Sequence, residues 1–81
     1  ITQYFVWIMN NFRFYFFSRE ETRKHIHVSS PNGEAKIWLE PEITVAKVIE
    51  LSNQDVTKIL DIVRDHLEEI NDFWNKHFSQ N

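Results

Sequence analysis

The most constraining feature of this sequence is an opening segment that is apolar on both faces of any strand it forms. Residues 4–9 and 12–17 consist almost entirely of aromatic and aliphatic side chains that favour β-strands. Asn10 and Asn11 between them tolerate the positive φ angles of a two-residue type I′ turn, so a β-hairpin is predicted. Both of its faces need cover, from the chain's own helix, a second copy or another protein.

The turn also predicts which side chains share a face of this hairpin. With Met9 opposite Phe12, one face carries Phe5, Trp7, Met9, Phe12, Phe14 and Phe16. The other face carries Tyr4, Val6, Ile8, Arg13, Tyr15 and Phe17. We expect the helix to cover the first face, which leaves Tyr4, Val6, Ile8 and Tyr15 as candidate partner-binding residues. Trp38 joins these candidates if its ring is exposed, because an exposed tryptophan is a typical interface hot spot, whereas a buried one is a core anchor.

A second hairpin is predicted after a polar connection over residues 18–24. Its strands are 25–29 and 34–39, and its turn is Ser30-Pro31-Asn32-Gly33, with Gly33 in a left-handed conformation beside a bulge. This turn places Ser30 opposite Glu34. His25 and His27 then share a face with Ala35, Ile37 and Leu39, which favours histidines in the core. Residues 43–49 fit a fifth strand or an extended connection equally well.

The last third of the chain is predicted to be helical. Ser52 followed by Asp55 resembles a capping box, and no Pro or Gly occurs after it. The apolar residues from Val56 to Phe78 lie within an arc of roughly 160°, which suits packing on a sheet. An unbroken helix of this length extends about 39 Å, more than the breadth of so small a globule. It must therefore overhang, serve a partner or break near Asp65-His66.

These elements predict a single α+β domain over residues 1–81, β-rich over 1–49 and helical over 50–81. An antiparallel meander of four or five strands packs on one long C-terminal helix, with a kink in that helix as an alternative.

Composition excludes several classes of protein. The 81 residues include no Cys and one Gly, which excludes disulfides, thiolate metal sites and glycine-rich phosphate loops. The longest apolar run, residues 4–9, is too short to cross a membrane, and no secretory or lipidation pattern is present, so we expect a cytoplasmic protein. The chain opens at Ile1 without Met, and we expect a few natural residues before it.

Charge is divided unevenly along the chain. Residues 1–39 carry five basic and three acidic side chains, whereas residues 40–81 carry four basic and nine acidic side chains. Solvated surface charge accounts for such a division, and so does orientation toward an anionic partner.

Several of these segments together resemble a known family. They are the aromatic opening hairpin, His25-Ile26-His27-Val28, the block from Gly33 to Pro41 and the helix that ends Trp74-Asn75-Lys76-His77-Phe78. The chain is similar to the bacterial domain-of-unknown-function family numbered 4160, and it departs from that pattern at Lys24, where the family usually has Pro. The resemblance carries over no catalytic residues. It implies a bacterial source and an adjoining gene for a second small protein, as in toxin–antitoxin pairs.

The most suggestive chemical groups are His25 and His27, because side chains two apart in a strand point to one face. A metal site would need a third ligand from Glu34, Glu40 or His66, and we expect neither a metal nor a cofactor. An alternative is a small RNA-cleaving toxin, with His25 or His27 as general acid or base. Its phosphate contacts would come from Arg13, Lys24 and Lys36, and a base would stack on Tyr15 or Trp38. The net charge of −3 gives nucleic-acid binding little support.

We therefore expect a non-enzymatic interaction module that binds a protein partner or a second copy of itself. The two-sided apolarity of the first hairpin carries this expectation.

Overall fold

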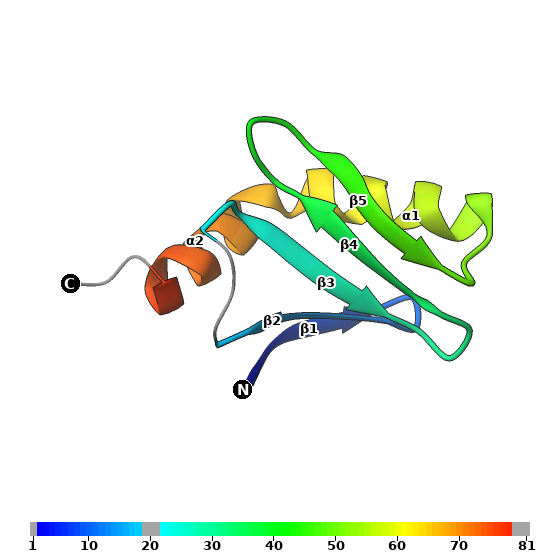
Figure 1. The fold of residues 1–81 in the computed structure, drawn as a ribbon, viewed down its shortest axis with the longest axis horizontal. Coiled ribbons are helices and arrows are strands. Elements are labelled where there is room, and N and C mark those ends of the chain that lie inside the picture. The colour runs from blue at the N-terminus through cyan, green and yellow to red at the C-terminus, as the bar shows by residue number, and fades with distance from the viewer. Residues whose placement is uncertain (1, 19–21, 79–81) are drawn as a thin grey trace.

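The computed structural model describes residues 2–18 and 22–78. Within them the chain forms, in order, β1 (Gln3–Met9), β2 (Phe12–Phe17), β3 (His25–Ser29), β4 (Glu34–Trp38), β5 (Thr44–Ile49), α1 (Asn53–Asp65) and α2 (Leu67–Phe78). Each strand pairs antiparallel with the next, so the sheet follows the order of the chain (Figure 1). The predicted α+β meander is confirmed, with 44–49 as its fifth strand. Residues 19–21 of the predicted polar connection and 79–81 of the predicted helix lie outside this description.

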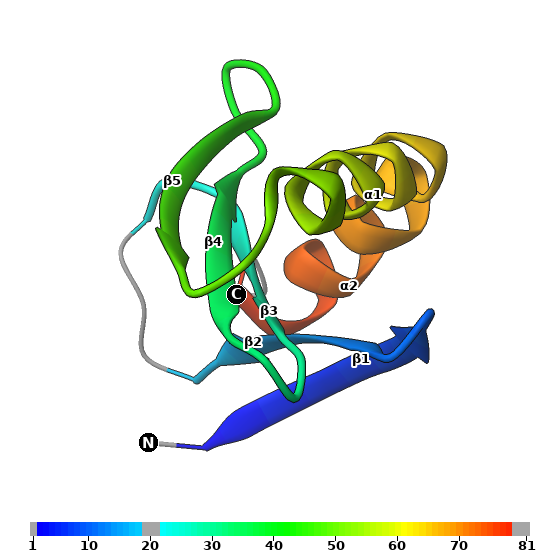
Figure 2. The same cartoon turned by 90° about the vertical axis from the view of Figure 1, so that its right-hand side faces the viewer.

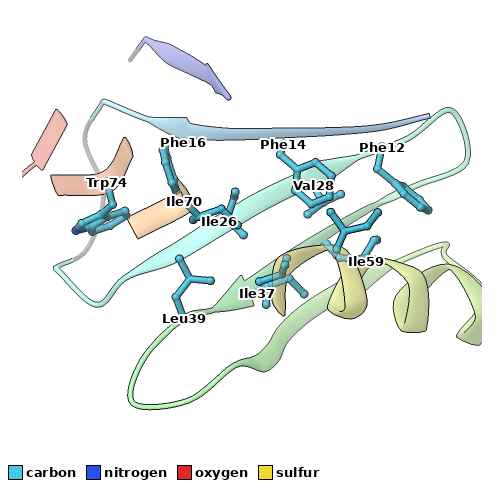
Figure 3. Packing of buried hydrophobic residues seen from close by; sticks show 13 residues of the cluster. Phe12, Phe14, Phe16, Ile26, Val28, Ile37, Leu39, Ile59, Ile70 and Trp74 are labelled. Carbon is cyan, nitrogen blue, oxygen red and sulfur yellow. The ribbon is translucent and has the colours of Figure 1, made fainter. Parts of the chain in front are cut away.

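The two helices lie against the same face of the sheet (Figure 2). Alternate residues of the central strands point toward them and are almost fully buried, as expected for side chains two apart in a strand. Figure 3 shows these side chains interlocking with Ile59, Ile70 and Trp74 of the helices. From the sheet they are Phe12, Phe14, Phe16, Ile26, Val28, Ile37 and Leu39.

The first hairpin has the predicted turn, and the pairings next to that turn are also as predicted. Asn10 and Asn11 adopt φ angles of 53° and 68°, as a type I′ turn requires. Met9, Ile8 and Trp7 face Phe12, Arg13 and Phe14 as expected. A bulge between Phe5 and Trp7 then shifts the pairing by one residue. The predicted faces of Tyr4 and Phe5 are therefore wrong: Tyr4 pairs with Phe16 on the helix side, and Phe5 with Tyr15 on the other.

The second hairpin differs from its predicted register by one residue throughout. Ser29, not Ser30, faces Glu34, and Ser30 donates its N–H to the carbonyl oxygen of Gly33 at 2.9 Å within a four-residue loop. Gly33 does not have a positive φ, so its predicted left-handed conformation is wrong. A slip of one residue turns every side chain to the opposite face. The slip buries Ile26 and Val28 among the apolar residues of the core and leaves His27 partly exposed, which stabilises the fold more than burying His27 in their place.

The predicted single helix is wrong in its continuity, because it breaks at His66. This residue caps α1 with φ −115° and ψ 19°, and its N–H reaches the carbonyl oxygen of Ile62 at 3.0 Å. A break near Asp65-His66 is one of the three alternatives that the sequence leaves open for this helix. Beyond it, α2 packs Trp74 edge-on against Phe16 of β2, with 5.4 Å between ring centroids. The break thus gives two shorter helices, both of which lie over the same face of the sheet (Figure 2).

Candidate binding face of the sheet

The sheet face turned away from the helices carries a row of side chains that crosses all five strands. Successive pairings join Phe5 to Tyr15, Tyr15 to His27, His27 to Lys36, and Lys36 to Lys47. Directly opposed residues share a face, and neighbouring strands lie about 4.8 Å apart, so these five groups form one continuous line. We call this surface the outer face; it comprises Phe5, Ile8, Arg13, Tyr15, Phe17, His27, Glu34, Lys36, Trp38 and Lys47.

The row ends in two lysines that face each other across β4 and β5. Like charges directly opposite in a sheet destabilise it by a few tenths of a kcal/mol to about 1 kcal/mol. Lys36 and Lys47 also line a hollow of about 280 Å³, together with Tyr15, Phe17, His27, Glu34 and Ala35. The hollow therefore has an aromatic side and a cationic side.

Cations on and beside the outer face lie on aromatic rings. The Arg13 guanidinium is 5.1 Å from the centroid of Phe5 and 5.2 Å from that of Tyr15. Trp38 has Arg23 at 4.0 Å and the Lys36 ammonium at 4.5 Å from its ring centroid. Such contacts keep charged groups beside apolar surface, the combination of Arg, Trp and Tyr that is enriched at the centres of protein interfaces.

Comparison with known families decides what kind of chain this is. The family model described as domain of unknown function DUF4160 matches residues 11–75, from the first turn into α2. The chain belongs to the DUF4160 family. No curated protein and no solved structure matches it.

The structure of this DUF4160 chain divides the five predicted binding residues into two groups. Ile8, Tyr15 and Trp38 lie on the outer face, and Ile8 is the most exposed of them at 62%. Tyr15 is buried in the hairpin beside Arg13. Tyr4 instead lies on the helix side and stacks on His77 of α2, with ring centroids 4.4 Å apart. Val6 lies in the bulge and packs against the core.

Two residues of the outer face, Phe5 and Lys47, are not among the binding residues predicted from the sequence. The bulge at Val6 turns Phe5, which is 46% exposed, to the outer face in place of Tyr4. An all-apolar strand gives no sequence signal for such a bulge. Lys47 is not among the predicted binding residues, because the sequence leaves residues 43–49 open between a strand and an extended connection. If residues 43–49 are taken as a strand, the alternation of Lys47 with Val48 places the lysine on the face opposite to the valine.

The predicted pair of histidines splits into one buried and one accessible group. His25 is fully buried and packs its ring against Trp38 and Trp74, and its Nδ1 lies 2.7 Å from the carbonyl oxygen of Arg23. His27 is partly exposed and stacks on Tyr15 at 5.5 Å, beside Lys36. The expected burial is confirmed for His25. It is wrong for His27, because the register slip pairs His27 with Lys36 and not with Ile37.

Within residues 2–18 and 22–78, no group of three or more His, Cys, Asp or Glu side chains is arranged to hold a metal ion. His66, the third ligand considered above, instead lies 2.7 Å from a carboxylate oxygen of Glu69. Among those same residues, neither helix has the length and apolarity needed to cross a bilayer.

Proposed function

We propose that this DUF4160 chain is a non-enzymatic interaction module that binds a protein partner through its outer face. The observation that carries the proposal is the composition of that face, which combines the exposed Phe5 and Ile8 with a half-buried arginine and a half-buried tryptophan, Arg13 and Trp38. Within the described residues, no helix covers it (Figure 2). The same composition characterises the energetic centres of protein interfaces.

The free energy of such binding has two identifiable sources. Burying the exposed parts of Phe5 and Ile8 contributes roughly 1 kcal/mol or more for each side chain. A carboxylate placed near Lys36 and Lys47 offsets the repulsion between them. An acidic partner with an apolar patch therefore suits this face best.

The family resemblance suggests where such a partner is encoded. A small protein from an adjoining gene, in an arrangement like that of a toxin and its antitoxin, is the partner we propose, and a second copy of this chain is the alternative. In this proposal, the chain is the member of the two-gene pair that binds the product of the other gene.

Coexpression with the product of the adjoining gene tests the proposal. Light scattering after size-exclusion chromatography should give the mass of a complex. Ile8→Asp should weaken it at least about tenfold, because a charge would replace an apolar contact. Thr57→Asp, at an exposed position of α1, is the matched control and should leave the complex unchanged. A chain that stays monomeric both alone and in the coexpression would contradict the proposal.

A small RNA-cleaving enzyme is the second candidate, and the position of His27 favours it. His27 lies between Tyr15 and Lys36 at the hollow that also contains Lys47, so an acid–base group and two cations are close together. His25 is fully buried, so its replacement would affect cleavage only by destabilising the fold. Purified chain incubated with RNA should show cleavage that His27→Ala abolishes without changing its circular dichroism. An absence of cleavage by the unaltered chain would eliminate this candidate.

A further inference from the structure

The strand at the end of the meander, β5, presents an open edge. It pairs with β4 on one side, and the views in Figures 1 and 2 show no strand beyond it. Among the described residues, no backbone hydrogen bond outside its ladder with β4 involves residues 44–49. An edge of this kind is a template for the backbone of another chain.

The two faces of β5 differ in chemistry. Lys47 points to the outer face opposite Lys36, whereas Val45 and Val48 are opposite Ile37 and Ala35 and so point to the helix side. Both valines nevertheless remain 40% and 38% exposed. The helices thus leave the apolar side of β5 partly uncovered.

From this arrangement we infer that the protein partner adds an extended strand to β5, with acidic side chains beside Lys47 and apolar side chains beside Val45 and Val48. A strand on this edge would alternate the two kinds of residue, because its successive side chains point to opposite faces. Its backbone would take up the open hydrogen-bonding groups of β5. The inference rests on the proposed function and names the chemistry of the partner.

Charge makes a second copy of β5 a poor occupant of this edge. Residues 44–49 contain Lys47 and no acidic side chain, so another β5 cannot supply the opposite charge. A lysine on an edge strand is also a common means of discouraging self-pairing. The same charge on Lys47 attracts an acidic strand and repels the β5 strand of a second copy.

Two synthetic peptides test the inference on the complete chain. One ten-residue peptide alternates Glu and Val, and its matched control alternates Lys and Val. We expect the Glu peptide to shift the amide resonances of residues 44–49 and to slow their hydrogen exchange. The Lys peptide should bind at least tenfold more weakly. Lys47→Glu should reverse this preference, and Lys47→Gln should reduce it.

The outcomes separate this inference from the proposed function. Equal binding of both peptides, no binding of either, or resonance changes at β1 and β2 without protection of β5 would each overturn the edge-strand inference. The coexpressed complex would remain as an independent result in all three cases. Dimerisation of the unliganded chain through β5, seen as amide protection that depends on its concentration, would overturn the inference in favour of a second copy.

Discussion

At the scale of single residues, Gly33 is needed for space and not for a special backbone conformation. A Cβ at this position would collide with the carbonyl oxygen of Ile49 and would lie 2.7 Å from that of Glu50. These are backbone atoms, so a rotamer change in a neighbouring side chain cannot relieve the contact. The glycine therefore allows the turn after β3 to approach the end of β5 closely.

Replacing Gly33 should consequently disturb the β4–β5 end of the sheet. We expect Gly33→Ala to lower the free energy of unfolding by about 2 kcal/mol or more, because backbone must move to admit the methyl group. Asn32→Ala, at the exposed neighbouring position, should change it by less than about 0.5 kcal/mol. Urea unfolding followed by circular dichroism measures both. Similar losses in the two variants would refute the close-approach explanation.

Lys47 is a residue at which stability and binding are expected to conflict. Lys47→Glu converts the like-charge pair with Lys36 into an opposite-charge pair, which should raise the free energy of unfolding by about 0.2–1 kcal/mol. The gain should shrink at high salt, and Lys47→Gln should give a smaller gain. Urea unfolding at two salt concentrations is the measurement. A destabilised Lys47→Glu variant would mean that Lys47 makes a favourable contact in the free chain.

At the scale of elements, the start of the helical region is determined by one local hydrogen bond. The hydroxyl oxygen of Ser52 accepts from the N–H of Asp55 at 3.0 Å, as the predicted cap requires. Because α1 contributes Ile59 and Val63 to the core, loss of its first turn would loosen one edge of that core.

Removal of this cap should have a moderate, specific cost. Ser52→Ala is expected to lower the free energy of unfolding by about 1 kcal/mol, whereas Ser52→Asp retains an acceptor and should lower it little. Thermal unfolding of the three chains tests this expectation. Equal melting temperatures for the Ala variant and the unaltered chain would show that water or another group replaces the cap.

The elements also show where sequence reasoning succeeds and where it stops. The Asn10-Asn11 turn and the apolar arc of the helices are local patterns, and both are present as predicted. The bulge in β1 and the register of the second hairpin depend on how whole strands pack, which a local pattern of turn residues does not reveal. The face of His27 follows from that register, so the candidate site could be predicted only in part.

At the scale of the whole molecule, charge separates by layer. The outer face carries Arg13, Lys36 and Lys47 against Glu34, whereas the two helices carry six acidic and three basic side chains. The uneven charge seen along the sequence thus becomes a cationic sheet face opposite an acidic helical layer. This polarity would orient an acidic partner toward the sheet.

Lysine reactivity in the proposed complex measures this central claim directly. Acetylation rates determined by mass spectrometry compare Lys36 and Lys47 on the outer face with the exposed Lys58 on α1, in the free chain and in the coexpressed complex. The account predicts that complex formation slows acetylation of Lys36 and Lys47 severalfold and leaves Lys58 unchanged. Protection of Lys58, with Lys36 and Lys47 as reactive as in the free chain, would place the partner on the helices and contradict the account.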